Sequence, residues 1–315
     1  PVPSPQSPVP SPQSPITNHQ SPITDPKSQM FHKYHALGND YLILDPARQS
    51  GAMARGLSPA QAVAICDRHR GVGSDGILYG PLAEEIRPGH FACEIWNPDG
   101  SIAEVSGNGL RIFARYLVDA GYVSLEETGD CVLHSGGRAI PIAYGKKADA
   151  PIRVELGRAS TTPGPGTLPS DLLAALGPAT LVNVGNPHCV FFPDAPINES
   201  LARRWGPLVE SDPAFPQRTN VQFVRVIDSH TIAIEIWERG AGYTQASGSS
   251  SCAAALAAIQ RNACASPVTV QMPGGDLTVD VASHADGWHV ALTGPITPVF
   301  VGRWGSGVDV PVPNP

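Results

Sequence analysis

One arrangement occurs twice along the chain and restricts the fold more than any other feature. Leu37-Gly38-Asn39-Asp40 leads into an apolar run, and Val184-Gly185-Asn186-Pro187 leads into another. Each is followed by a serine turn that opens a helical segment, Ser106-Gly107-Asn108-Gly109 and Ser247-Gly248-Ser249-Ser250. The matching order predicts two half-domains of common design that face a shared cleft. Chance similarity between glycine-rich turns is the alternative interpretation.

The rest of the pattern is typical of a mixed α+β fold. Short apolar and alternating runs predict strands, and apolar residues at helical spacing predict a few helices. The strands are expected at 41–44, 93–96, 181–184, 190–192, 221–226 and 231–237, and the helices at 59–68, 110–119 and 252–260. The many glycines and prolines mark the turns between them.

The chain divides into a tail, two half-domains and a short end segment. Residues 1–28 form four seven-residue units that each begin with proline and end with serine. Such a segment cannot bury a core, so residues 1–29 are expected to be disordered. The N-terminal half-domain is predicted at 30–147, with 291–305 returning to it. The C-terminal half-domain is predicted at 148–290 and a flexible end at 306–315.

Composition excludes several classes of function. The net charge of −7 argues against nucleic-acid binding, which requires a basic stripe. No apolar run is long enough to cross a membrane, and the start carries no secretory pattern, so we expect a cytoplasmic protein. The six cysteines are spaced widely and irregularly, which favours buried thiols over disulfides or a zinc site. We expect no bound metal.

The two serine turns suggest a chemistry. Glycines let backbone N–H groups point into a cavity, and a helix start adds positive potential, so each turn suits a carboxylate. Most such turns only cap helices. Two that face each other would place a side-chain oxygen on either side of one α-carbon, the geometry for inverting a stereocentre with a base and an acid. Cysteine suits this role because a helix start lowers its pKa, whereas a serine hydroxyl is a weaker base and needs an activating neighbour.

From about Met30 to Trp304 the chain resembles the diaminopimelate epimerases. The matching segments are HALGNDYLILD at 35–45, CDRHRGVGSDGIL at 66–78, NPDGSIAEVSGNGLRIFARYL at 97–117, VGNPHCVFF at 184–192, NVQFV at 220–224 and ERGAGYTQASGSSSCAAA at 238–255. The resemblance implies two pseudo-symmetric half-domains, each a bent, mainly antiparallel sheet around a central helix. It also implies an active site in the cleft between them, a small amino-acid substrate, a homodimer and no cofactor.

The resemblance also implies roles for individual residues. Ser106 and Ser247 occupy the acid/base positions, and His188 and Glu238 would tune that pair. Arg239 would grip a distal carboxylate with its guanidinium. The full set of implied substrate-binding residues is Asn39, Asn97, Gly107, Asn108, Asn186, Asn220, Glu238, Arg239, Gly248 and Ser249. Each has a plainer alternative, since a lone asparagine commonly makes an Asx-turn and His188 could be a satisfied core histidine.

The chain departs from the family pattern in the same region. Serine stands at both positions of the catalytic cysteines, Ser106 and Ser247. Tyr243 replaces a common glutamate, Ser250-Ser251 replace a small Gly-Ala pair, and Gly76 occupies a position that can hold a substrate-binding glutamine. An engineered Cys-to-Ser pair would leave its neighbours unchanged, so these departures favour a natural divergent branch.

The resemblance therefore predicts a cofactor-independent isomerase that interconverts LL- and meso-diaminopimelate by two-base α-proton transfer, for lysine and peptidoglycan synthesis. In that branch Glu238, His188 or a bound water would activate the serines. Three alternatives stay open: a racemase or dehydratase for another amino acid, such as a hydroxyproline-type substrate; an amino-acid-binding protein without catalysis; and an engineered Cys-to-Ser form that binds without turnover.

Overall fold

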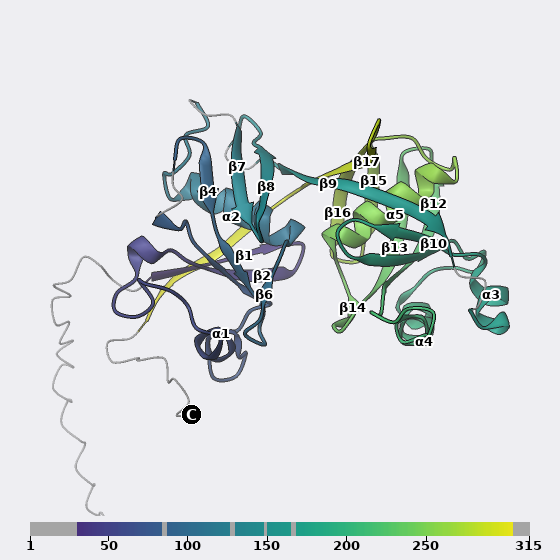
Figure 1. Cartoon of the computed structure of the whole chain (residues 1–315), viewed down its shortest axis with the longest axis horizontal. Coiled ribbons are helices and arrows are strands. Elements are labelled where there is room, and N and C mark those ends of the chain that lie inside the picture. The colour runs from purple at the N-terminus through teal and green to yellow at the C-terminus, as the bar shows by residue number, and fades with distance from the viewer. Residues whose placement is uncertain (1–29, 84–86, 127–129, 148–149, 165–167, 305–315) are drawn as a thin grey trace, which may run out of the picture.

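The computed structural model describes residues 30–83, 87–126, 130–147, 150–164 and 168–304. The predicted tail at 1–29 and the predicted flexible end at 306–315 lie outside these residues. The described chain forms two lobes that lie side by side (Figure 1). Each lobe has a long helix at its centre surrounded by strands, as expected for duplicated α+β halves.

In the first lobe, α2 (Gly107–Asp119) lies between a six-stranded sheet and the strands β7 and β8. Leu110, Ile112 and Phe113 on this helix are fully buried. Most residues of this helix are buried, which places it in the core of the lobe. In spatial order the sheet contains β18 (Thr297–Arg303), β1 (Met30–Ala36), β2 (Asn39–Leu44), β3 (Ile77–Tyr79), β5 (Glu94–Trp96) and β6 (Ile102–Ala103).

A twelve-stranded sheet begins in the first lobe and forms most of the second. Its strands in spatial order are β4 (His90–Ala92), β7 (Asp130–Ser135), β8 (Arg138–Ala143), β9 (Ile152–Pro163), β17 (Gly287–Gly294), β16 (Gly275–His284), β15 (Val268–Met272), β13 (Thr231–Glu238), β12 (Asn220–Asp228), β11 (Pro187–Phe191) and β10 (Thr180–Asn183), with β14 (Gly242–Thr244) beside β13.

The second lobe is a closed ring of strands around one helix. β10 pairs with β9 as well as with β11, so the strands from β9 to β10 close on themselves. The helix α5 (Gly248–Gln260) lies inside and contacts strands on all sides of the ring. Its residues 252–258 are mostly alanine and fully buried. Small side chains allow the strands to approach the helix closely from every direction.

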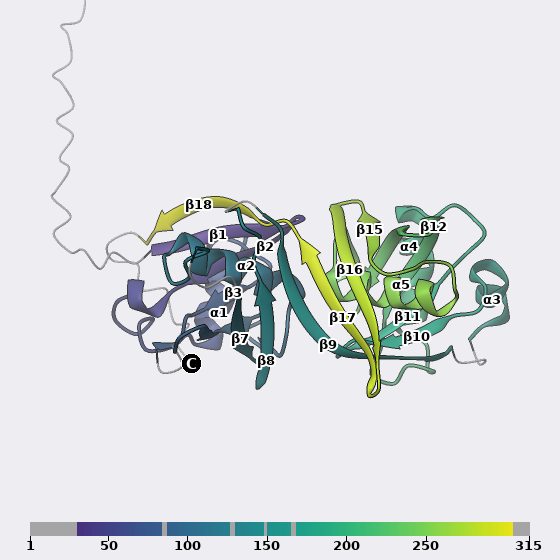
Figure 2. The same ribbon diagram turned by 90° about the horizontal axis from the view of Figure 1, so that it is seen from above.

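Two strand connections join the lobes. β9 leaves the first lobe and pairs with β17 along its length, and β17 then leads to β18, which returns to pair with β1 (Figure 2). In that return Met30 lies opposite Arg303. The domain limits drawn from the sequence stay a prediction, and these two crossings are the observed links between the lobes.

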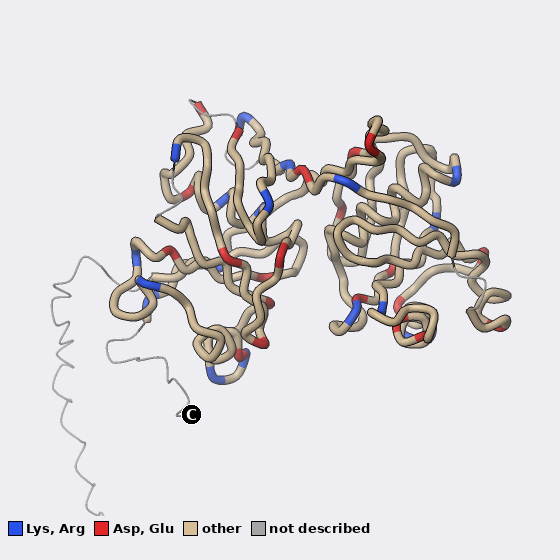
Figure 3. The backbone as a smooth tube through the Cα atoms, viewed as in Figure 1, with Lys and Arg blue, Asp and Glu red and all other residues tan. Residues whose placement is uncertain are grey.

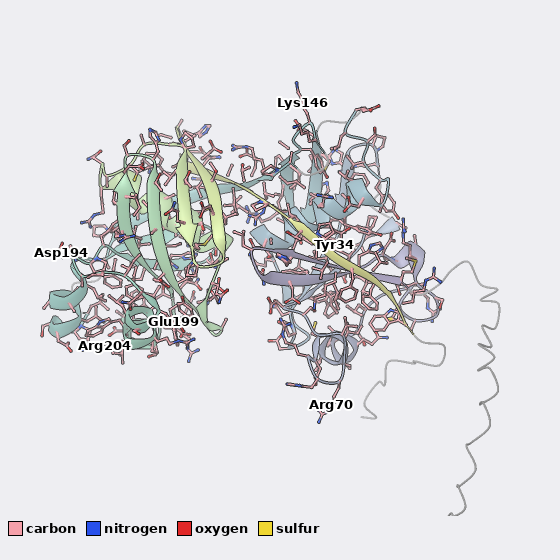
Figure 4. The ribbon with its side chains drawn as sticks, turned by 180° about the vertical axis from the view of Figure 1, so that it is seen from behind. Tyr34, Arg70, Lys146, Asp194, Glu199 and Arg204 are labelled. Atoms are coloured by element: carbon pink, nitrogen blue, oxygen red, sulfur yellow. The ribbon has the colours of Figure 1, made fainter. Side chains whose placement is uncertain are left out.

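The predicted helices all occur, and the serine turns begin two of them. The helix predicted at 59–68 is α1 (Pro59–Cys66), and the other two are α2 and α5. The sequence analysis did not predict α3 (Ser170–Leu176) or α4 (Glu199–Glu210). In α4, Pro207 lies inside the helix, which obscures the helical signal. Glu199 and Arg204 of α4 are labelled in Figure 4 at the outer part of the second lobe.

The other predictions from composition can be compared with the structure. All six cysteines are buried free thiols, which confirms that interpretation. Acidic and basic residues are interspersed over both lobes (Figure 3). Within the described ranges no helix combines the length and the apolar character needed to cross a membrane.

Candidate active site

A cavity of about 1300 Å³ lies between the lobes and is lined from both of them. Most of the residues that the sequence analysis assigned to the site form its wall: Asn39, Asn97, Ser106, Gly107, Asn108, Asn186, Glu238, Arg239, Ser247, Gly248 and Ser249. His188 and Asn220 do not line it and are buried, 1% and 5% exposed. Both serine turns therefore line the same cavity.

The two central helices begin in the same way and meet at the cavity. Ser106 caps α2 and Ser247 caps α5, and each hydroxyl accepts a hydrogen bond from the third amide of its helix, at 3.0 and 3.4 Å. A Cβ atom placed on Gly248 would lie 3.8 Å from Cα of Gly107 and only 2.8 Å from Cδ2 of Leu292. A side chain at position 248 would therefore displace the end of the Leu292 side chain. A bound carboxylate would meet the positive ends of both helices.

Glu238 is the ionisable neighbour of Ser247. It ends β13 and lines the cavity together with Ser247. Burial raises the pKa of its carboxyl, the nearby Ser247 hydroxyl lowers it in part, and the charge of Asp75 raises it further. A carboxylate only accepts hydrogen bonds, so Glu238 is a candidate acceptor for the proton of Ser247.

Tyr41 is the corresponding neighbour of Ser106, and the sequence analysis missed it. Its phenol oxygen lies 3.2 Å from Oγ of Ser106, and its ring lines the cavity although the residue is only 6% exposed. Burial raises the pKa of Tyr41 to about 12, against a smaller lowering by the Ser106 hydrogen bond. An aromatic residue inside the apolar run of β2 is typical of core. The available signal was its place two residues after Asn39.

Asn39 and Asn108 belong to a polar chain that fixes their amides. Arg111 donates to Oδ1 of Asn108 at 2.8 Å, Asn108 donates to Oδ1 of Asn39 at 3.1 Å, and Asn39 donates to Asp75 at 2.9 Å. Arg111 is fully buried, and its Nε and Nη1 have no hydrogen-bond partner in the described part of the chain. Burial lowers its pKa, yet a guanidinium stays charged near neutral pH. This cation lies beside the helix starts and favours an anionic ligand.

His188 lies behind the cavity wall. Its Nε2 is 2.9 Å from Oδ1 of Asn186, and its Nδ1 is 3.0 Å from Nε2 of Gln222, which also donates to Ser250 at 3.0 Å. Burial lowers the pKa of His188 to about 3, and the charge of Arg239 lowers it further. The imidazole is therefore neutral at physiological pH and orients Asn186, which does line the cavity.

Asn220 ties together two segments of the far wall. Its amide donates to the carbonyl of Pro187 at 3.0 Å and accepts from the backbone N–H of Arg239 at 2.9 Å. The Arg239 side chain is exposed and donates to the carbonyl of Gln217 at 3.0 Å. Asn220 thus sets the position of Arg239, a residue of the cavity wall.

Asn97, the remaining predicted site residue, is half-buried in the cavity wall and donates to Ser101 at 2.9 Å. Tyr243, one of the departures from the family pattern, does not line the cavity, and its hydroxyl donates to Glu235 at 2.8 Å. Among the residues that the structure describes, no cluster of three or more His, Cys, Asp or Glu side chains is arranged to hold a metal ion.

Solved structures share the fold. A phenazine biosynthesis protein of the PhzF family from Bacillus anthracis superposes with a TM-score of 0.65 at 13% identity, covering 88% of this chain and 99% of that one. A hydroxyproline epimerase from Agrobacterium vitis, with trans-4-hydroxy-L-proline bound, gives a TM-score of 0.61 at 12% identity, covering 88% and 92%. These likenesses confirm the α+β fold class.

Sequence comparison gives the family. The profile described as diaminopimelate epimerase matches residues 31–162 and 180–299. Diaminopimelate epimerase 2 of Nostoc sp. is 44% identical over 285 residues, covering 87% of this chain and 94% of the relative. A diaminopimelate epimerase of Synechococcus sp. is 37% identical over 292 residues, covering 88% and 98%. This chain belongs to the diaminopimelate epimerase family of isomerases.

Proposed function

We propose that this chain interconverts LL- and meso-diaminopimelate without a cofactor, with Ser106 and Ser247 as the acid/base pair. The observation that carries the proposal is the meeting of two serine-capped helix starts at one cavity, whose wall also includes the carboxyl-bearing Glu238. Relatives named diaminopimelate epimerase supply the substrate. The reaction would serve lysine and peptidoglycan synthesis. A cytoplasmic location and a homodimer stay predictions.

The reacting end of the substrate is assigned to the helix starts. The α-carboxylate would accept hydrogen bonds from the amides of α2 and α5, beside the charge of Arg111. The α-carbon would then lie between the two serine hydroxyls. One serine removes the α-proton and the other supplies a proton to the opposite face, which inverts the centre. Helix dipoles and the buried cation stabilise the negative charge that develops on the carboxylate.

The distal end is assigned to Arg239, with Asn97 and Asn186 beside it on the cavity wall. A guanidinium binds a carboxylate bidentately. We infer that Asn220 acts by holding the Arg239 backbone and that His188 acts by orienting Asn186, since both are buried behind the wall.

Arg239→Ala is expected to raise KM for diaminopimelate by roughly 10²-fold or more, because the distal carboxylate loses its charged partner. Steady-state kinetics on both stereoisomers would measure this. Arg203→Ala is the matched control, since Arg203 pairs with Glu199 on α4 and does not line the cavity. Unchanged KM and kcat in Arg239→Ala would remove the distal-carboxylate role.

The decisive test is proton NMR of the purified chain with LL-diaminopimelate in deuterated water. Loss of the α-proton signal together with appearance of the meso isomer is the expected result. Binding without exchange would mean that the chain is an amino-acid-binding protein. Exchange with another amino acid, such as a hydroxyproline-type substrate, but not with diaminopimelate would mean that the scaffold serves a different substrate.

A further inference from the structure

Resting on the proposed function, we propose that Arg111 and Asp75 fix the direction of the two asparagine amides that lie between them, and that this fixed direction selects a carboxylate at the reacting end of the substrate. The family resemblance assigns a role to neither residue. Both are positioning residues that act through Asn108 and Asn39. The three hydrogen bonds that join these four side chains carry the inference.

Arg111 sets the direction of the first amide. A guanidinium has five N–H donors and no acceptor, so the atom of Asn108 that it contacts must be the carbonyl oxygen. Nη2 of Arg111 donates to this Oδ1 at 2.8 Å. Nδ2 of Asn108 therefore points away from Arg111, and it donates to Oδ1 of Asn39 at 3.1 Å.

Asp75 sets the same direction from the opposite end. Its Oδ2 accepts from Nδ2 of Asn39 at 2.9 Å and from the backbone N–H of Asp40 at 3.1 Å. Its Oδ1 accepts from Nη2 of Arg68 at 2.6 Å. Because both ends require the same order of donors and acceptors, exchanging nitrogen and oxygen in either asparagine would place like groups face to face.

Burial makes such a reversal costly. Arg111 is fully buried and Asn108 is only 6% exposed, so water has little access to replace a lost partner. A buried polar group that is left unpaired loses more free energy than a typical hydrogen bond contributes. Hydrogen bonds in a chain also polarise one another, and here a cation begins the chain and a carboxylate ends it.

The fixed amides present donors to the cavity. Asn39 and Asn108 both line it, and in the described part of the chain the second hydrogen of each Nδ2 has no partner. The first backbone N–H groups of α2, from Gly107 and Asn108, have no acceptor within the helix either. These donors match a carboxylate, whereas a carboxamide would bring an NH2 group against some of them. A site that cannot reverse its own groups rejects the mismatched ligand.

The probe for this selection is the monoamide of LL-diaminopimelate, in which one α-carbon bears a carboxylate and the other a carboxamide. Proton NMR in deuterated water follows loss of the two α-proton signals separately. The ratio of the two rates, carboxylate end over carboxamide end, shows which group occupies the helix starts and does not depend on the amount of active protein. The preference of the distal wall is common to all variants and cancels when they are compared.

The variants are Arg111→Gln, Asp75→Asn and both together. In each single variant the remaining end still fixes the direction. Loss of the cation should lower the ratio and loss of the carboxylate should raise it, so charge alone would leave the double variant at the product of the two single effects. With an amide at both ends, which can donate or accept, the direction is free. The ratio should then fall about 10-fold or more below that product, since an unpaired buried polar group counts for this order.

Asp99→Asn combined with Arg111→Gln is the matched control. Asp99 also lines the cavity, but its carboxylate accepts from Ser101 and is not joined to the two asparagines. This pair should give the product of its single effects. Melting temperatures would confirm that each variant folds, and Arg111→Met, which also gives Asn108 no direction, replaces Arg111→Gln if that variant does not. A ratio at the product in the double variant with Asp75→Asn would overturn the inference and leave the proposed function intact.

A measurement without substrate separates this inference from the proposed function. Nitrogen-15 NMR observes the side-chain amide hydrogens of Asn39 and Asn108. Their exchange with water should be slow in the unaltered chain and in both single variants, and faster only in the double variant. Equal exchange in all four proteins would overturn the fixed direction. Slow exchange in an unaltered chain that is inactive on diaminopimelate would overturn the proposed function and the selection of its carboxylate, but not the fixed direction.

Discussion

Glu238→Gln is expected to lower kcat for epimerisation by about 10³-fold while both central helices stay folded. A positioned acid or base contributes on the order of 10²–10⁴-fold, and Glu238 is a carboxylate of the cavity wall whose pKa the Ser247 hydroxyl lowers. The amide of glutamine keeps the shape and a hydrogen bond but cannot take up the proton of Ser247. Ser247 alone is then too weak a base.

The pH profile provides a second measurement of the same prediction. Glu238 must be ionised to accept a proton, so activity is full above its pKa and is lost as the pH falls through it. Burial raises that pKa. The acid limb of kcat should therefore lie at higher pH than the reference value of about 4.3 for glutamate. In Glu238→Gln the residual rate should show no such limb.

Glu235→Gln is the matched control for this change. Glu235 lies on the same strand, its pKa is also raised by burial, and it accepts a hydrogen bond from Tyr243 outside the cavity. This variant should keep its rate and its acid limb. If Glu238→Gln retained full activity, another group would have to accept the proton.

Replacing both serines, Ser106→Cys with Ser247→Cys, is expected to raise kcat about 10²-fold or more. A thiol is a far better proton acceptor and donor near neutral pH than an aliphatic hydroxyl, and a helix N-terminus lowers its pKa. Both positions cap a helix and accept a backbone N–H, so each thiolate would receive that stabilisation. Proton NMR in deuterated water would follow exchange and inversion together.

The control is Ser58→Cys, a serine that caps α1 in the same manner outside the cavity. It should leave turnover unchanged, and its melting temperature shows what a cysteine cap costs in stability. No gain from the double replacement, in a folded protein, would mean that the surroundings are rebuilt around hydroxyls.

The departures from the family pattern are integrated into the structure around the serines. Ser250 accepts from Gln222, which also contacts His188, and Ser251 donates to the carbonyl of Ser247 at 2.8 Å. Gly76 provides the space that the ring of Tyr41 occupies. Departures that make such contacts favour the natural divergent branch over a simple engineered pair.

Local chemistry made the helix starts predictable. Serine and glycine at a turn determine an N-cap within a few residues, so both serine turns identified the start of a central helix and the two sides of the cavity. The closed ring of the second lobe was not predictable in this way. Its closure depends on β9 pairing with β10, in which Ser160 lies opposite Asn183. Periodicity gives the faces of a strand but not its distant partner.

The limits were similar for individual site residues. The resemblance implied that Asn220 and His188 are site residues. The sequence around them does not show whether a residue lines the cavity or lies behind its wall. The place of Tyr41 in the site could not be predicted, because an aromatic ring in an apolar strand is expected in the core. Only the contact of its hydroxyl with Ser106, 65 positions away in the chain, shows that Tyr41 also belongs to the cavity.

The contact between the two helix starts has a consequence for how the lobes move. Gly107 and Gly248 already meet, and two strand crossings join the lobes. We therefore expect any rotation of one lobe against the other to pivot at this contact, so that the separation of the two serines changes least. Distance measurements between spin labels placed near the helix starts and on the outer surfaces of the two lobes would test this expectation.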